Sequence, residues 1–543
     1  MSTPPPAAPA ALGQQQQVVL GRSSAIASSH SLITTEGARV LAAGGNAIDA
    51  TLAMAAVSWV VLPGQCGIGG DAFAIVREPD GRVWTVGGSG YGPDGGTPDF
   101  YRERGHSAIP LTGALSVTVP GAPAAHAVLA RHARWDLARL WAGGIGLARH
   151  GFACTAKNRA DITERRAPLA ADPSTAACFL PDGDVPAVGR LLHQRDLATT
   201  LEVLAEDPMA FYRGELAERS LDFLTRGGAP FAGEEWQAGA LLTEQPAITG
   251  RYGTLTVHQT PLPSAGWMVL HQAGLLDGSL GALDLLGPEA CGLFAGAART
   301  AFDDRYAGVN ADNSVWRELL STDYLARQRA DLADPARPGE SLHASIDGDT
   351  TSTVVVDDEG RTVSFIHSLA FTFGARITVP GTGIVLNNRL GRGAYLVPDH
   401  PNEVAPRRKP LHTLNAWIAD GPQGLAHVGN CPGGDGQVQW NMQVLSHLVD
   451  HGLDPQHAVS LPRLTVFPGS DADVIDRPSE VRLEEGLPAA TVDALRAAGH
   501  LVREIPVQRG GPGGSALAIS RDPHTGVLSA GADPRMEGTA VAW

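Results

Sequence analysis

A run of small hydroxyl side chains opens the stretch DTTSTVVVDDEGRTVSF, residues 349–365. Residues 350–356 are rich in β-branched types, residues 357–360 have turn chemistry, and residues 361–365 alternate again, so the stretch predicts a β-hairpin. A buried strand does not need so many hydroxyls in a row. The first of them, Thr350, therefore invites a chemical explanation.

A threonine at the very start of a chain combines a nucleophile with its own base. If the bond between Asp349 and Thr350 is cut, Thr350 carries both a hydroxyl and a free α-amine, whose unperturbed pKa is near about 8. The hydroxyl can then attack an amide carbonyl and form an acyl-enzyme without a Ser-His-Asp triad. The same hydroxyl could also make the cut by attacking the carbonyl before it, which would explain the hydroxyl cluster.

Such a nucleophile needs donors for the negative oxygen of its intermediate. In GNCPGGDGQ, residues 429–437, the consecutive backbone N–H groups of Gly433 and Gly434 precede a helical run and could form an oxyanion hole. Taken singly, a threonine-rich strand is usually structural and a glycine pair before a helix is usually an ordinary loop. The two features carry weight only together with the rest of the chain.

Composition excludes several other functions. The chain has 543 residues and a formal net charge of −16, which argues against nucleic acid or an anionic membrane as a partner. The 18 histidines show no metal-binding spacing, and GIGGDAF lacks the strand and helix of a cofactor loop, so we expect no metal and no cofactor. Five scattered cysteines predict free thiols and a cytoplasmic location.

The elements that would position this chemistry can be read along the chain. Residues 1–19 read as a disordered Pro/Ala/Gln tail without the features of a signal peptide. Helices are expected near residues 31–40 and 46–62, a hairpin over residues 71–88, and mostly helix over residues 115–250. Strands dominate after residue 349. Because strands come in hairpins and helices in blocks, we expect antiparallel sheets covered by helices rather than βαβ units.

Several stretches, in order along nearly the whole chain, together resemble the γ-glutamyltranspeptidase family. They include GGNAIDATLAMA, GIGGDAF, DTTSTVVVDDEGRTVSF, FGARITVPGTGIVLNN, NCPGGDGQ and the closing GADPRMEGTAVAW. The resemblance implies an α+β fold, the αββα sandwich of N-terminal-nucleophile hydrolases. It also implies self-cleavage between Asp349 and Thr350 into a large fragment, residues 20–349, and a small one, residues 350–543, intertwined in one domain.

The same resemblance assigns roles to individual residues. Thr350 matches the family's catalytic threonine, and Ser368 falls where a second hydroxyl residue hydrogen-bonds the nucleophile. Gly433 and Gly434 match the oxyanion glycines.

The chain departs from the family where true transpeptidases bind the glutamyl group. Ser89 stands in place of the arginine that holds the α-carboxylate. The family's Asn, Gln and Asp, which hold the α-amine, and its paired serines are replaced here by Ala370, Arg389, Arg392, His412 and Thr413. A cation beside a substrate ammonium would repel it, which argues against glutathione as the substrate.

One side branch of the family is more similar. SFIHSLAFTFG, GIVLNNR, KPLHTLN and GGDGQ resemble the oxamate amidohydrolase branch. Arg389 and His412 suit a substrate carboxylate, because arginine offers a two-pronged fork of donors, and Thr413 and Ser89 complete the predicted substrate-binding set. In the competing interpretation, Arg389 and His412 form salt bridges with Asp or Glu at the rim of the site.

The sequence thus predicts a cytoplasmic, self-processing amidohydrolase that acts on the amide of a small carboxylic acid such as oxamate. Its expected partners are the small amide substrate and its own two fragments; a homodimer is left open. One alternative is a γ-glutamyltransferase-like acylase or acyltransferase that uses another acyl amide. The other is an uncleaved, inactive relative that acts as a binding protein.

Overall fold

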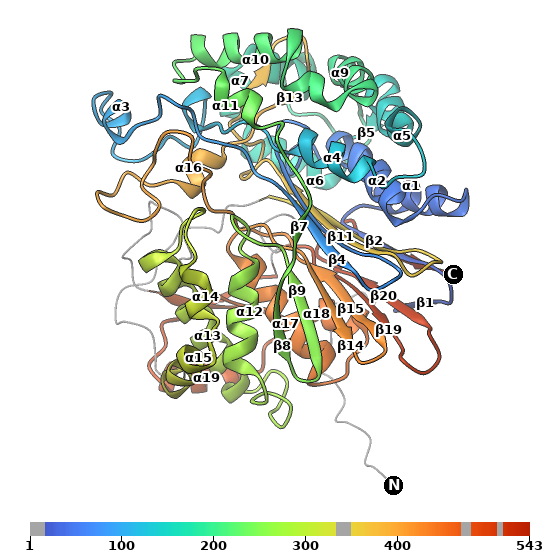
Figure 1. Cartoon of the computed structure of the whole chain (residues 1–543), viewed down its shortest axis with the longest axis vertical. Coiled ribbons are helices and arrows are strands. Elements are labelled where there is room, and N and C mark those ends of the chain that lie inside the picture. Colours follow the sequence, from blue (N-terminus) through green and yellow to red (C-terminus); the bar gives the residue numbers. More distant parts are fainter. Residues whose placement is uncertain (1–16, 333–348, 468–478, 508–513) are drawn as a thin grey trace.

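Two seven-stranded sheets stack face to face in the computed structural model, and helices cover both outer faces (Figure 1). The structure describes residues 17–332, 349–467, 479–507 and 514–543. Every strand pairing within these two sheets is antiparallel. The predicted αββα sandwich is therefore confirmed.

The first sheet holds the predicted catalytic hairpin at its centre. Its strands, in spatial order, are β21 (Thr539–Ala542), β2 (Ala25–Ser28), β10 (Thr351–Val356), β11 (Thr362–Ser368), β3 (Asp71–Arg77), β4 (Val83–Gly88) and β7 (Gln245–Pro246). The second sheet contains β1 (Val19–Gly21), β20 (Leu528–Ala532), β19 (Leu517–Arg521), β15 (Gly424–Asn430), β14 (Trp417–Gly421), β9 (Leu255–Gln259) and β8 (Ile248–Tyr252).

Alternation along β10 explains why the strand is apolar on both sides. Val354 and Val356 belong to the core between the sheets, whereas Val355 belongs to the core under the helices. Because both faces of the strand are buried, a polar side chain there is costly unless it finds a partner within the protein.

One helix layer packs on the first sheet. It is built around α2 (Ala47–Val61), whose every residue is buried, and includes α1 (Ser31–Ala42), α4 (Ala122–Ala130), α5 (Leu137–His150), α6 (Ala156–Glu164), α9 (Arg195–Glu206) and α10 (Gly214–Arg226). Asn46 caps α2 in a capping box with Asp49. The predicted hairpin over residues 71–88 is β3 and β4.

The other layer covers the second sheet. Its main helices are α12 (Gly266–Leu276), α13 (Pro288–Gly308), α17 (Gly436–Val449), α18 (Pro455–Ser460) and α19 (Ala489–Ala497). Beside it lies a small sheet of β16 (Leu464–Phe467), β17 (Glu480–Glu484) and β18 (Val502–Ile505).

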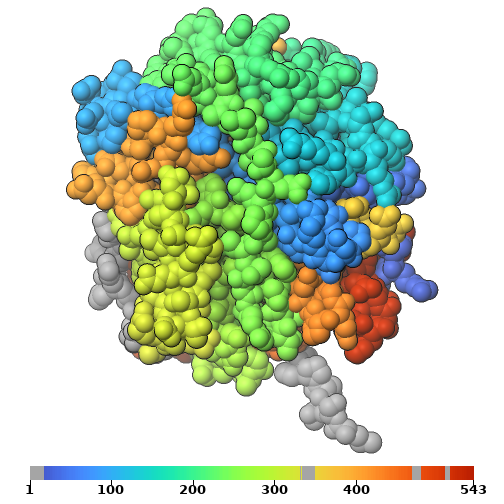
Figure 2. All heavy atoms as spheres, viewed as in Figure 1, coloured from blue at the N-terminus to red at the C-terminus, as the bar shows by residue number. Residues whose placement is uncertain are grey.

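Segments from the two predicted fragments interleave throughout. Strands β10 and β11 pair with β2 and β3, and β21 pairs with β2. On the surface, residues near 400 in orange lie beside residues near 100 in blue (Figure 2), where Arg102 Nη2 donates to Glu403 Oε1 at 2.6 Å. The predicted tail of residues 1–19 ends too late, because Val19 already pairs with Ala530; residues 1–16 lie outside the described part.

Candidate active site

The predicted nucleophile lies directly before β10, at the open end of the central hairpin. Thr351 pairs with His367, so Thr350 lies across from Ser368 at the end of β11. Thr350 Oγ1 donates to Ser368 Oγ at 3.0 Å, and Ser368 Oγ donates to the carbonyl oxygen of Asp349 at 2.8 Å. The backbone N–H of Ala370 donates to the same Ser368 Oγ at 2.9 Å. The continuous chain therefore links the threonine hydroxyl to the carbonyl just before it through one buried serine.

The neighbouring hydroxyls do not share in this arrangement. The side-chain oxygens of Thr351, Ser352 and Thr353 are buried and have no hydrogen-bond partner among the described residues. Among the hydroxyls of this run, only that of Thr350 reaches Ser368. The idea that self-cleavage explains the whole cluster therefore finds support for its first member alone.

The glycine pair forms the sharp turn before α17. The φ angles of Gly433 and Gly434 are +125° and +57°, a region that suits glycine. A Cβ on Gly433 would lie 2.2 Å from the ring of Trp440, so space also requires glycine there. The carbonyls of both glycines accept the bonds of the first helical turn. Their own N–H groups thus lie at the positive end of a helix dipole, where an oxyanion is favoured.

Contacts connect this turn to the nucleophile. β15, which leads into the turn, contacts β11 across the sandwich, where Asn430 Nδ2 donates to Ser364 Oγ at 3.1 Å.

A second connection runs through a short helix. Arg392 Nη2 lies 3.6 Å from a carboxylate oxygen of Asp435, the residue after the glycines. Arg392 belongs to α16 (Arg389–Gly393), and Asn388, just before that helix, donates its N–H to the carbonyl of Leu369, next to Ser368.

Arg389 is buried against Asp71 and is only partly paired. Asp71 pairs in register with Ser368, and Arg389 Nε donates to Asp71 Oδ2 at 3.2 Å. The Arg389 side chain is 1% exposed, yet Nη1 and Nη2 have no hydrogen-bond partner among the described residues. The expected salt bridge exists, but it lies in the interior rather than at a rim, and it leaves the two outer nitrogens of the fork unsatisfied.

His412 joins the same cluster as a neutral side chain. Its Nε2 lies 2.8 Å from Ser89 Oγ and 3.8 Å from Asp71 Oδ2. Burial, together with the nearby charges of Arg389, Arg305 and Lys409, holds the pKa of His412 well below its usual value. His412 therefore does not bring a positive charge to this site near neutral pH.

Thr413 lies at the edge of the cluster. Gln437 Nε2, in the first turn of α17, donates to the hydroxyl of Thr413 at 3.5 Å. The structure therefore brings Ser89, Arg389 and His412 together and places Thr413 between them and the glycine turn.

The sequence reasoning missed the charges that surround this cluster. Burial raises the pKa of Asp71 to about 6, against the pull of Arg389. Arg305 reaches in from α13 and donates Nη1 to the carbonyl of His412 at 2.7 Å, and burial lowers the pKa of Lys409. Asp71 stands in GIGGDAF at the start of a strand, which was a visible signal, whereas Arg305 lies on a distant helix and gave none.

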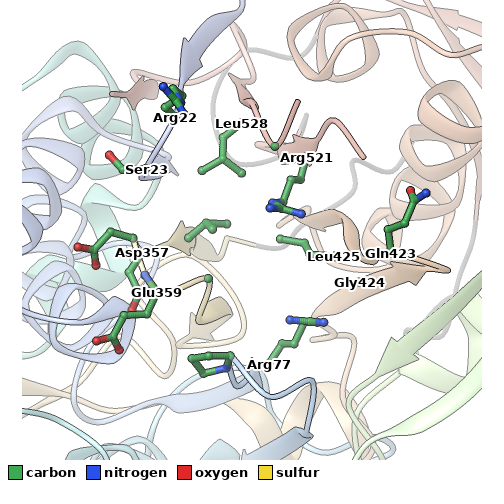
Figure 3. A pocket seen from close by; sticks show the side chains of 15 residues that line it. Arg22, Ser23, Arg77, Asp357, Glu359, Gln423, Gly424, Leu425, Arg521 and Leu528 are labelled. Atoms are coloured by element: carbon green, nitrogen blue, oxygen red, sulfur yellow. The ribbon is translucent and has the colours of Figure 1, made fainter. Parts of the chain in front are cut away.

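A separate cavity of about 300 Å³ opens at the other end of β10 (Figure 3). Arg77 and Arg521 point into it over an apolar floor that includes Leu425 and Leu528, whereas Asp357 and Glu359 point away. Arg77 Nε donates to Asp420 Oδ1 at 2.8 Å. None of the predicted site residues lines this cavity.

The described residues offer few features of other kinds of site. No group of three or more His, Cys, Asp or Glu side chains there could hold a metal ion. No helix in that part of the chain is both long and apolar enough to span a bilayer. All five cysteines are free, as their scatter predicted.

The family model described as gamma-glutamyltranspeptidase matches residues 34–543. This chain belongs to the γ-glutamyltranspeptidase family. It is 33% identical over 537 residues to the glutathione hydrolase-like YwrD proenzyme of Bacillus subtilis, which covers 96% of this chain and 99% of the relative. It is 31% identical over 528 residues to the oxamate amidohydrolase proenzyme of Klebsiella pneumoniae, with 95% and 97% covered.

A solved structure agrees with this assignment. The cephalosporin acylase from Bacillus halodurans superposes with a TM-score of 0.88 at 29% sequence identity, covering 100% of this chain and 99% of that one. As a γ-glutamyltranspeptidase-family protein with the N-terminal-nucleophile hydrolase sandwich, the chain is an enzyme, a hydrolase that acts on carbon–nitrogen bonds. The predicted resemblance is confirmed at the level of the family.

Proposed function

We propose that this chain is a self-cleaving amidohydrolase whose nucleophile is the hydroxyl of Thr350. One observation carries the proposal: Thr350 Oγ1, Ser368 Oγ and the carbonyl oxygen of Asp349 form a buried chain of hydrogen bonds of 3.0 and 2.8 Å. Ser368 donates to the carbonyl that is to be attacked and so draws electron density from its carbon. A hydroxyl held beside a polarised carbonyl is arranged for attack.

Self-cleavage then proceeds in two steps. The Thr350 oxygen bonds to the carbonyl carbon of Asp349, the bond from that carbon to the Thr350 nitrogen breaks, and the hydroxyl proton passes to the nitrogen. Water hydrolyses the resulting ester, which returns the hydroxyl to Thr350 and leaves a carboxylate on Asp349. The freed α-amine of Thr350 now serves as the base for later turnovers.

Turnover repeats the same chemistry on an external amide. The hydroxyl attacks the substrate carbonyl, the amine leaves, and water releases the acid from the acyl-enzyme. In this proposal the N–H groups of Gly433 and Gly434 stabilise the oxyanion. Their place at the dipole end of α17, in a turn where Gly433 has no room for a side chain, supports that role.

The substrate we propose is the amide of a small carboxylic acid, such as oxamate. The two outer nitrogens of Arg389 are buried without a partner, and a carboxylate would satisfy both at once. The electrostatics agree, because Arg305, Arg392 and Lys409 add further positive charge around Asp71. The family likeness includes an oxamate amidohydrolase at 31% identity.

A second candidate is an acylase with a larger acyl group. It is favoured by the TM-score of 0.88 to a cephalosporin acylase over the full chain. Ammonia release from oxamate, compared with hydrolysis of glutathione, of a cephalosporin side-chain amide and of neutral small amides, separates the candidates. Preference for oxamate supports our proposal, and preference for the larger amide replaces it with the acylase.

The test of self-cleavage uses the intact protein. A denaturing gel and a mass spectrum of the purified chain should show two fragments in place of one 56.5 kDa band, and the smaller fragment should begin TTSTVVVD. Thr350→Ala should remain uncleaved and inactive, while Thr350→Ser, which keeps a hydroxyl, should still cleave. An active preparation with an unbroken chain would overturn the proposal and point instead to an unprocessed relative.

A further inference from the structure

The side chain of Asp349, the residue before the proposed scissile bond, is held from three directions. Gln65 Nε2 donates to Asp349 Oδ1 at 2.9 Å, Lys157 Nζ donates to Oδ2 at 3.0 Å, and Thr372 Oγ1 donates to Oδ2 at 3.1 Å. The three donors come from the turn after α2, from α6 and from the loop after β11. With its carbonyl on Ser368, Asp349 is fixed at both its backbone and its side chain.

Lys157 is the only charged donor among the three, and it is shared. Its Nζ lies 2.5 and 2.6 Å from the two carboxylate oxygens of Asp161, one turn along the same helix. The Lys157 side chain is 8% exposed and that of Asp349 is 2% exposed. Burial opposes the charge on Lys157, but Asp349 and Asp161 together raise its pKa, so it is an ammonium between two acidic side chains. Burial and the nearby Asp349 raise the pKa of Asp161 to about 7.

We propose that Lys157 is a positioning residue for self-cleavage, which holds the carboxylate of Asp349 so that the scissile carbonyl stays on Ser368 and within reach of the Thr350 hydroxyl. The inference rests on the proposed function, because it assumes that Thr350 cuts this bond. The physical reason is geometric: rotation of Asp349 about its backbone would carry the carbonyl away from both hydroxyls, and small misplacements of reacting atoms slow reactions strongly.

The carboxyl group of Asp161 also matters after the chain is cut. Hydrolysis of the ester leaves Asp349 with a second negative charge, so the cluster then holds three carboxyl groups around one ammonium. When the end of the large fragment leaves, Asp161 remains beside Lys157, and the buried ammonium keeps a partner. One lysine between two acids thus serves both the uncleaved and the cleaved chain.

The decisive measurement is the rate at which freshly purified precursor splits into two fragments. Lys157→Met should slow this cleavage by about tenfold or more, whereas Lys157→Arg, which keeps the charge, should recover most of the rate. Molecules that do cleave should turn over substrate at the wild-type rate per cleaved chain. That split between cleavage and turnover is one that a general loss of folding would not produce.

Two matched variants separate positioning from stability. Asp161→Asn removes a carboxylate from the same cluster but leaves the bond from Lys157 to Asp349, so it should cleave at least as fast as the wild type. Arg482→Met breaks another buried ion pair, with Glu480 at 2.5 Å, on the small sheet, and should lower stability without slowing cleavage. Wild-type cleavage in Lys157→Met, or equal slowing in Arg482→Met, would overturn the inference.

A folding failure would not leave the question open. If Lys157→Met gives no soluble protein, the double variant Lys157→Gln with Asp161→Asn removes a cation and an anion together and keeps the net charge. It should fold and still cleave slowly; rapid cleavage contradicts the role of Lys157. Failure of the proposed function looks different, because the wild-type chain itself would then not be cut before Thr350.

Discussion

Similar ion pairs are in different states at the two ends of β3, which pairs with β11 in the same sheet as β10. At one end Arg389 meets Asp71, and at the other Arg77 meets Asp420. The pair near Thr350 is 1% and 0% exposed and leaves two guanidinium nitrogens without a partner, whereas the far pair is 13% and 18% exposed and borders an open cavity. At the far end, water can satisfy the hydrogen-bonding groups that have no partner within the protein.

This difference indicates that a ligand binds at the buried end, beside Arg389. A half-buried ion pair beside solvent is a common feature of protein surfaces and contributes little. A fully buried guanidinium with unsatisfied nitrogens is costly, and such a group is kept where something else binds it. The two ends should therefore respond differently to substitution: the Thr350 end through chemistry and binding, and the far end through stability alone.

The largest effect is expected from Ser368→Ala. The change removes the hydroxyl that joins Thr350 to the carbonyl of Asp349, so self-cleavage should slow by about 100-fold or more. Ser364→Ala is the matched control on the same strand, because Ser364 Oγ donates to the carbonyl of Gly429 at 2.9 Å and takes no part in the relay. Time courses on a denaturing gel measure both. Equal rates for the two variants would remove the contrast between the ends of the hairpin.

The sequence predicted this end of the strand well, for physical reasons. Residues close together in the chain, such as Thr350 and Ser368 across a hairpin, are placed by local pattern and turn chemistry alone. The glycine pair was visible for the same reason, since both its conformation and its neighbour Trp440 lie within one short segment. The layers of the sandwich followed from strand pairs and blocks of helices.

The long-range partners could not be predicted from one sequence. Asp71 meets Arg389, which is 318 positions away in the chain, and Lys157 reaches Asp349 from a helix 192 positions earlier. The pattern of a helix does not tell which residue it will meet. The neutral state of His412 likewise depends on burial and on two cations from other segments, Arg389 and Arg305.

A smaller effect is expected from Arg389→Met. Loss of two charge-assisted bonds to the substrate carboxylate should raise KM for oxamate by about tenfold or more, with little change for a neutral amide of the same size. The far-end control is Arg361→Met, which breaks the 2.8 Å bond from Arg361 Nε to Glu78. That control should alter stability and leave KM unchanged. A similar KM for oxamate in the wild type and Arg389→Met would show that the fork is not the acid's partner.

The pH dependence of KM should follow Asp71. Burial raises its pKa to about 6, so Asp71 is ionised above that pH and then offsets part of the charge of Arg389. Below it Asp71 is protonated, the site becomes more positive, and an anionic substrate should bind more tightly. His412 does not interfere, because its pKa lies well below the usual value.

We therefore expect KM for oxamate to fall by about fivefold between about pH 8 and about pH 5. Asp71→Asn should show the lower KM at every pH. Initial rates over this range measure KM separately from kcat, which titration of the Thr350 amine also affects. A KM that rises on acidification in the wild type would mean that Asp71 itself contacts the substrate.

The smallest effect belongs to the far end. Burial alone would raise the pKa of Asp420, but bonds from His258 and Arg77 lower it. A lowered folded-state pKa stabilises the fold above the unfolded value near about 4, and that stability is lost as the pH falls through the folded value. Asp420→Asn should therefore cost roughly 1 kcal/mol near neutral pH, a shift of about 1 °C in Tm, and the difference should shrink toward about pH 3.

Thermal scans at one heating rate and several pH values measure this difference, and fragment yield and KM should match those of the wild type at all of them. The Asp420 variant therefore tests whether the far end acts through stability alone. If removing one carboxylate beside the cavity changed cleavage or KM, the two ends of β3 would be coupled through the strand. The contrast between a reactive end and a structural end would then not hold.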